Sequence, residues 1–129
     1  MAELASSCGV RDLSWLRGRR VLVVEDEYLL AEDLRRDLEN QGAEVLGPVP
    51  SVSEALKLLG QDPAPDLAVL DINLQGEMVY LVADALRAQA IPFLFTTGYE
   101  AQSIPPAYAD VPRMEKPLAL RELLQVRQG

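Results

Sequence analysis

Short apolar runs recur along the chain, and each is followed at once by polar residues that can bind a charged ligand. Unbroken aliphatic runs of four or five residues indicate buried strands, and leucines at three- to four-residue spacing between them indicate helices. Strands that alternate with helices predict a parallel sheet covered on both faces. We therefore predict an α/β, flavodoxin-like, doubly wound sheet of five parallel strands in the order 2-1-3-4-5, folded as a single domain.

The expected strands are 20–24, 44–46, 66–70, 93–96 and 111–114, and the expected helices are 27–40, 51–59 with a cap at Ser51 or Ser53, about 77–86, and 119–126. The segment Gly47-Pro48-Val49-Pro50 is expected to end the second strand. The proline-rich stretch 99–110 is the least regular, so the fourth helix is expected to be short or irregular.

The length of 129 residues is most simply that of one domain. We expect residues 1–18 to be an N-terminal extension and residues 19–129 to be the main domain. Two interpretations of the extension stay open. It is either a poorly ordered end with a turn or two packed by Trp15, or an arm for docking or dimerisation.

The composition excludes several classes of function. A formal net charge of −8 argues against a general binder of nucleic acid or anionic membranes, since both need a positive field. The single cysteine, Cys8, excludes an internal disulfide and a thiolate metal cage, and the absence of histidine excludes catalytic triads and a phosphohistidine carrier. No long apolar run or signal peptide is present, so a cytoplasmic protein is expected.

The polar residues at the strand ends predict a site. Glu25 and Asp26 follow the first strand, Asp71 the third, Thr97 the fourth and Lys116 the fifth. The carboxyl ends of parallel strands meet at one edge of a sheet, where open α/β sheets bind ligands. Carboxylates, a hydroxyl and an ammonium at this edge suit Mg²⁺ and a phosphoryl group.

Each of these residues also has an ordinary structural explanation. Glu25 and Asp26 are as well suited to capping a helix as to binding a metal. Asp71 could bond its own backbone in a turn, and a lysine such as Lys116 is usually a surface residue. Gly98 favours the functional interpretation, because a backbone N–H without a side chain lets a phosphoryl group approach closely. For a purely structural interpretation, all these explanations would have to hold at once for residues that lie in order along one edge of the sheet. Such a coincidence is improbable.

The chain resembles the receiver domain of two-component response regulators over about residues 20–127. The motifs that carry the resemblance contain Glu25-Asp26, Asp71-Ile72-Asn73, Thr97-Gly98 and Glu115-Lys116-Pro117. The segment 92–99 further resembles that of the single-domain FAT GUY-type subgroup, with Thr96 where the motif has alanine.

The resemblance implies a role for each motif residue. Asp71 would be the phosphoacceptor. Mg²⁺ would be bound by Asp26, Asp71 and the backbone carbonyl of Asn73, with Glu25 acting through water. Lys116, the Thr97 hydroxyl and the Gly98 N–H would hold the phosphoryl oxygens.

Three further expectations follow from the resemblance. Tyr99 is expected to slow hydrolysis of the phosphorylated form. Pro117 permits a cis peptide bond, which would fix where Lys116 points. Arg113 stands where the family usually has its switch aromatic, and we therefore hypothesise a rearranged or dynamic face between the fourth strand and the last helix.

The expected function is that of a stand-alone receiver that acts as a phosphorelay switch or carrier. Its partner would be a sensor histidine kinase or a histidine phosphotransfer protein, and a homodimer is left open. The chain would catalyse only its own phosphorylation and dephosphorylation. One alternative is a receiver-like interaction module that needs no phosphorylation. A phosphatase of the haloacid dehalogenase type is disfavoured, because Glu25-Asp26-Glu27 does not supply the paired aspartates of that family.

Overall fold

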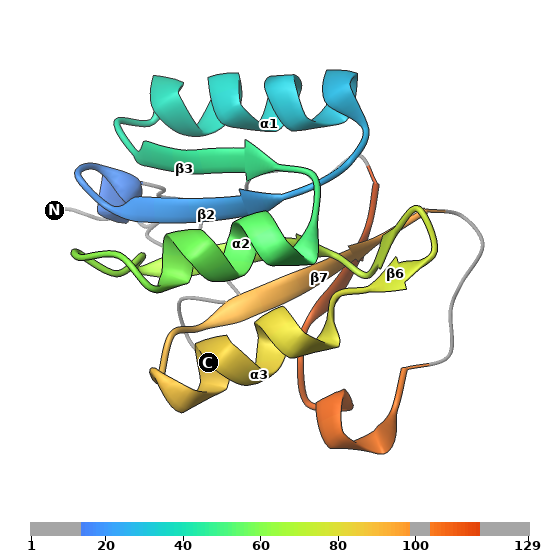
Figure 1. Cartoon of the computed structure of the whole chain (residues 1–129). Helices are drawn as coiled ribbons and strands as arrows, with labels where there is room; N and C mark the ends of the chain where they lie inside the picture. Colours follow the sequence, from blue (N-terminus) through green and yellow to red (C-terminus); the bar gives the residue numbers. More distant parts are fainter. Residues whose placement is uncertain (1–13, 99–103, 117–129) are drawn as a thin grey trace, which may run out of the picture.

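A computed structural model describes residues 14–98 and 104–116. Five parallel strands form the sheet: β2 (Arg20–Val24), β3 (Glu44–Val49), β4 (Leu67–Asp71), β7 (Phe93–Thr97) and β8 (Arg113–Glu115). Their spatial order is β3-β2-β4-β7-β8 (Figure 1). Numbered along the chain this is 2-1-3-4-5, so the predicted doubly wound topology is confirmed.

Helices cover both faces of the sheet. α1 (Tyr28–Asn40) lies on one face, and α2 (Val52–Leu59) and α3 (Tyr80–Ala88) lie on the other (Figure 1). Successive strand residues point to opposite faces, so Val23 packs in the core on the α1 side and Leu22 in the core beside α2 and α3. Because both faces are covered, nearly every residue of β2, β4 and β7 is buried, as unbroken apolar strands require.

The two edge strands differ from their predicted bounds. The prediction that β3 ends at Leu46 is wrong, because the strand continues through Gly47 and Pro48 to Val49 and ends only before Pro50. The pairing of β2 with β3 shifts register between Leu22 and Val24, and this bulge leaves room for the extra residues. Proline is tolerated here because an edge strand has one unpaired side. β8 begins two residues later than predicted.

A small hairpin follows β4 and was not predicted. β5 (Asn73–Leu74) pairs antiparallel with β6 (Glu77–Met78). Gln75 and Gly76 join them with φ values of 55° and 96°, as a tight hairpin turn requires. The hairpin places Asn73 directly beside the end of β4.

Other expectations concern helix ends and connections. Ser51, not Ser53, is the cap of α2, and its hydroxyl accepts the Glu54 N–H. In the described part of the β7–β8 connection, the helical element is one 3-10 turn, η3 (Pro106–Tyr108), in keeping with a short fourth helix. The expected final helix at 119–126 and Cys8 lie outside the described residues.

The boundary between the extension and the main domain stays a prediction. Within the described residues 14–18, the 3-10 turn η2 (Ser14–Leu16) buries Leu16 fully in the core on the α1 side, with Trp15 packed beside it. Among the helices that the structure describes, none combines the length and the apolar character needed to cross a membrane.

We predict that Gly47→Ala costs about 3 kcal/mol or more of unfolding free energy. Gly47 has a φ of 91°, and a Cβ there would lie 2.7 Å from the Val49 nitrogen and 3.0 Å from the Val23 oxygen. Gly76→Ala is the matched control, since its φ is 96° but nothing lies within 4 Å of a Cβ. The control should cost only about 1–2 kcal/mol. Equal losses in urea denaturation would contradict the steric argument.

Candidate functional site

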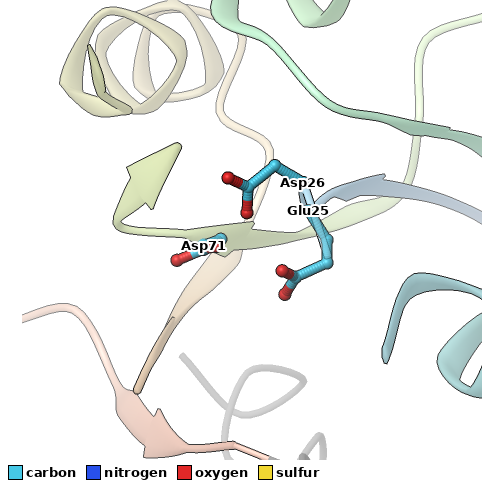
Figure 2. Close-up of side chains that lie close together, drawn as sticks. All are labelled: Glu25, Asp26 and Asp71. Atoms are coloured by element: carbon cyan, nitrogen blue, oxygen red, sulfur yellow. The ribbon is translucent and has the colours of Figure 1, made fainter. Parts of the chain in front are cut away.

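Three carboxylates converge at the carboxyl edge of the sheet. Glu25 and Asp26 follow the last residue of β2, and Asp71 is the last residue of β4. The two strands are neighbours, with Val24 opposite Leu70, so the three side chains come from adjacent strand ends (Figure 2). One oxygen from each carboxylate lies within 4.8 Å of the others. Glu25 is 9% and Asp71 3% exposed, so this negative charge is largely removed from water.

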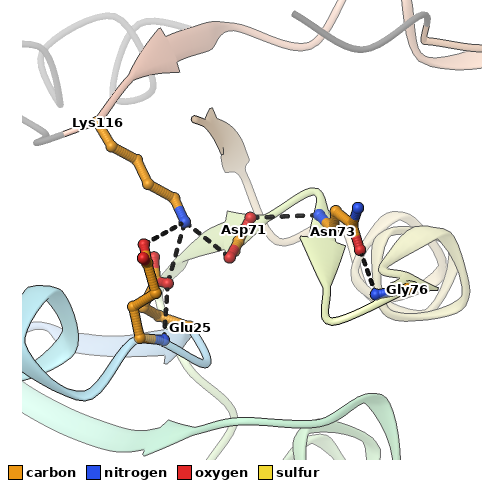
Figure 3. A network of polar contacts seen from close by, with 6 residues as sticks. Glu25, Asp71, Asn73, Gly76 and Lys116 are labelled. Atoms are coloured by element: carbon orange, nitrogen blue, oxygen red, sulfur yellow. Dashed lines mark hydrogen bonds and ion pairs between the residues drawn. The ribbon is translucent and has the colours of Figure 1, made fainter. Parts of the chain in front are cut away.

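Lys116 supplies the positive charge of the site. It follows β8, and its backbone N–H donates to the Thr97 carbonyl at 2.9 Å. Its ammonium donates to Asp71 Oδ2 at 2.8 Å and to Glu25 Oε2 at 3.0 Å (Figure 3). It also lies 3.4 Å from Glu27 Oε1, a contact that the sequence did not predict. The ammonium therefore bridges the ends of three strands.

Asn73 holds the other oxygen of Asp71. Its backbone N–H donates to Asp71 Oδ1 at 3.2 Å, and its side-chain oxygen accepts the Gly76 N–H at 2.6 Å (Figure 3). The two Asp71 oxygens thus have different partners, Asn73 on one side and Lys116 on the other. The hairpin β5–β6 orients the phosphoacceptor predicted from the sequence.

Thr97 and Gly98 lie at the carboxyl end of β7, at the same edge of the sheet. Thr97 is 6% exposed and ends β7, but among the described residues no hydrogen bond joins its hydroxyl to Asp71 or Lys116. Thr96 is paired with Asp71 in the sheet and lines a cavity of about 220 Å³ together with Glu25 and Lys116. A Cβ on Gly98 would meet nothing within 4 Å.

The helix-capping explanation of Glu25 and Asp26 is wrong. The N-cap of α1 is Glu27, whose side chain makes no capping hydrogen bond. Glu25 instead accepts the Glu27 N–H at 3.0 Å with the same oxygen that receives Lys116. Tyr99 and Pro117 lie outside the described residues.

Burial and neighbouring charges shift the pKa values of both Asp71 and Lys116. Burial raises the pKa of Asp71 to about 7, and the hydrogen bond from Lys116 only partly offsets this while the charge of Glu25 adds to it. Burial by itself lowers the pKa of Lys116, but its hydrogen bonds to Asp71 and Glu25 outweigh the burial and hold the pKa above its usual value. The site therefore favours the charged ammonium of Lys116 and disfavours the ionised form of Asp71.

The donor set fits a hard divalent cation. All the clustered donors are carboxylate oxygens, which Mg²⁺ and Ca²⁺ prefer, and the cluster contains no nitrogen or sulfur ligand of the kind that zinc prefers. The Lys116 ammonium contacts three carboxylates, those of Glu25, Glu27 and Asp71. Asp26 adds a fourth carboxylate to the cluster. This excess of negative charge would be relieved by a bound cation.

We predict that Asp71→Asn stabilises the metal-free protein, and does so by about 3 kcal/mol more at pH 8 than at pH 5. The pKa of Asp71 is raised from 3.8 to about 7 on folding. Its contribution to stability is therefore present below pH 4 and lost as the pH rises through 7. Urea denaturation in EDTA at both pH values measures the effect. Asp62→Asn, at an exposed position after α2, is the control. An equal gain at both pH values for Asp71→Asn would contradict the prediction.

Comparisons with known proteins identify the family. The family model of the response regulator receiver domain matches residues 21–126. The regulator PhyR of Methylorubrum extorquens is 33% identical over 99 residues, which are 75% of this chain and 37% of PhyR. The transcriptional regulatory protein PdtaR of Mycobacterium tuberculosis is 27% identical over 110 residues, 82% of this chain and 53% of PdtaR. The chain thus spans only about a third to a half of the curated relatives that it matches.

Solved structures agree with this match. The solution structure of SdrG from Sphingomonas melonis Fr1 is 35% identical, with a TM-score of 0.75, and the match covers 86% of this chain and 94% of SdrG. The BeF₃-activated conformation of SdrG from Pseudomonas melonis Fr1 is 34% identical, with a TM-score of 0.69 over 84% of this chain and 92% of that one. This chain belongs to the response regulator receiver domain family.

Proposed function

We propose that the chain is a phosphoacceptor receiver, in which Asp71 takes a phosphoryl group from a phosphohistidine. The donor would be a sensor histidine kinase or a histidine phosphotransfer protein, and the chain would act as a phosphorelay switch or carrier. The single observation that carries the proposal is the Lys116 ammonium, 2.8 Å from the carboxylate of Asp71 and surrounded by the acidic cluster.

The proposed reaction is a transfer between two nucleophiles. An Asp71 carboxylate oxygen attacks the phosphorus, a P–O bond forms, and the P–N bond to the donor imidazole breaks. The imidazole nitrogen keeps the electron pair of that bond. Such transfers depend on position and on neutralisation of charge rather than on covalent help from the protein. With Lys116 as its neighbour, Asp71 still has a pKa of about 7, so further positive charge beside it would increase the share of carboxylate at neutral pH.

One set of residues would bind Mg²⁺ and another would bind the phosphoryl oxygens. Mg²⁺ would be held by Asp26, Asp71 and the Asn73 carbonyl, with Glu25 through water, and when bound it would neutralise charge on the acceptor and on the phosphoryl group. Lys116, the Thr97 hydroxyl and the Gly98 N–H would receive the phosphoryl oxygens. Lys116 already reaches Asp71, whereas the Thr97 hydroxyl would have to gain its contact.

The comparisons support this proposal without extending to its details. SdrG, which is similar over most of its length, has a BeF₃-activated conformation, and beryllofluoride is a phosphoryl analogue. Membership of the receiver family argues against the dehalogenase-type phosphatase. The acidic cluster and Lys116 argue against a phosphorylation-independent module, the remaining alternative. Self-catalysed phosphorylation and dephosphorylation and a cytoplasmic location are parts of the proposal.

We predict that acetyl phosphate with Mg²⁺ adds one phosphoryl group to the wild type, seen by intact mass spectrometry. Asp71→Ala should stay unmodified, and EDTA should abolish the addition to the wild type because the acids around Asp71 would lose their counter-ion. Transfer from candidate sensor kinases to the wild type and to Asp71→Ala extends the test. A wild type that is never modified by any donor would contradict the proposed function.

We predict that Lys116→Met slows phosphorylation at least about tenfold, because removal of a charge-assisted contact to the phosphoryl group costs more than about 1.4 kcal/mol. The chain has one other lysine, Lys57, which lies exposed on α2 away from the site. Lys57→Met is therefore a matched control and should react at the rate of the wild type. Equal rates for both variants would remove Lys116 from the site.

A further inference from the structure

The segment that precedes β8 is fastened to α3 by Tyr108. Its hydroxyl donates to Asp84 Oδ1 at 2.5 Å, and its ring stacks on Tyr80 with centroids 4.8 Å apart and planes 12° apart. Its ring also meets Phe95 of β7 edge-on at 6.1 Å. Tyr108 is only 8% exposed, and the hydrogen bond to Asp84 holds its pKa above the usual value. One side chain thus connects η3, α3 and the central part of the sheet.

Arg87 makes a second connection between the same two parts. Its guanidinium donates to the Ala107 carbonyl at 2.9 Å and to Asp110 Oδ1 at 2.6 Å. The guanidinium carbon lies 5.3 Å from the centroid of the Tyr108 ring. The connection therefore combines a cation–π contact with two hydrogen bonds.

Only seven residues separate Tyr108 from Lys116, and backbone hydrogen bonds fix this segment to itself and to β7. The Tyr108 carbonyl accepts the Val111 N–H at 3.0 Å, and the Pro112 carbonyl accepts the Phe95 N–H at 2.9 Å. β8 follows at once and Lys116 comes directly after it. β8 has three residues and, in the described sheet, pairs only with β7. So short an edge strand holds its position weakly by itself.

We propose that Tyr108, supported by Arg87 and Asp84, is a positioning residue for Lys116. It anchors the start of the segment that ends in β8, and so keeps the lysine backbone where its ammonium reaches Asp71. Asp71 and Glu25 attract the Lys116 ammonium even without this anchor. If β8 is less well fixed, however, each contact between Lys116 and these carboxylates costs more conformational entropy. The inference concerns the placement of Lys116 and rests on the proposed function only for its consequence in phosphoryl binding.

The two lysines of the chain allow a direct test in the metal-free protein. Acetic anhydride labelling, followed by digestion and mass spectrometry, gives the rate at Lys116 relative to that at exposed Lys57. We expect Tyr108→Phe and Arg87→Met each to raise this ratio about three- to tenfold, the effect of losing one or two hydrogen bonds. Arg35→Met, which breaks the ion pairs with Glu32 and Glu39 on α1, is the matched control and should leave the ratio unchanged.

Asp84 offers a conservative rescue. Asp84→Ala removes the acceptor of the Tyr108 hydroxyl and should match Tyr108→Phe, whereas Asp84→Asn keeps an acceptor and should restore most of the wild-type ratio. Combining Asp84→Ala with Tyr108→Phe should add little, because both changes remove the same hydrogen bond. Full additivity of the two changes would contradict the pairing.

Binding measurements distinguish a displaced Lys116 from a general disturbance of the site. In the anchor variants, beryllofluoride with Mg²⁺ should bind about three- to tenfold more weakly, while Mg²⁺ alone should bind as well as in the wild type or better. The reason is that Lys116 competes with the cation for Asp71 and Glu25. Parallel weakening of both ligands, or an unchanged labelling ratio, would overturn the inference. A wild type that binds no beryllofluoride would overturn the proposed function, while the labelling ratio would still decide the placement of Lys116.

Discussion

The site depends on one ammonium that balances several carboxylates at the edge of a parallel sheet. Asp71 and Glu25 are nearly inaccessible to water, and both lie within 3.0 Å of Lys116 Nζ. Two such buried acids without a cation would repel each other and lose hydration that nothing replaces. The order of the strands solves this problem, since it sets the end of β8 within reach of the ends of β2 and β4 across β7. The geometry that neutralises the acids is also the geometry that would receive a phosphoryl group.

The central part of the fold could be predicted from the sequence because its signal is local. β2, β4 and β7 are buried on both faces, and a continuous aliphatic run is the direct consequence of that burial. The errors fall at the edges of the sheet. β3 is half-exposed and continues through Gly47 and Pro48. These two residue types ordinarily predict the end of a strand, so the prediction placed the end too early. The hairpin β5–β6 has two residues per strand, too few for any periodicity to be recognised.

The site residues could be predicted for the same reason that the strands could. Glu25, Asp26, Asp71 and Lys116 are each fixed by the end of a strand, so strand order alone brings them together. The contact of Glu27 with Lys116 could not be predicted, because it depends on how the first turn of α1 is oriented. The same holds for Tyr108, whose partners Tyr80 and Asp84 lie in a helix more than twenty residues earlier and follow no motif.

Tyr80 of α3 and Tyr108 of η3 both pack against Phe95, while the family's usual aromatic position on β8 is occupied by Arg113. Tyr80, Asp84 and Arg87 lie on successive turns of one helix, and all three contact the same tyrosine. A protein that binds α3 and tilts or unwinds it would therefore displace the Lys116 ammonium. It would do so without contacting the acidic cluster itself. Natural variation along that helix would then alter the chemistry of a carboxylate with which it shares no contact.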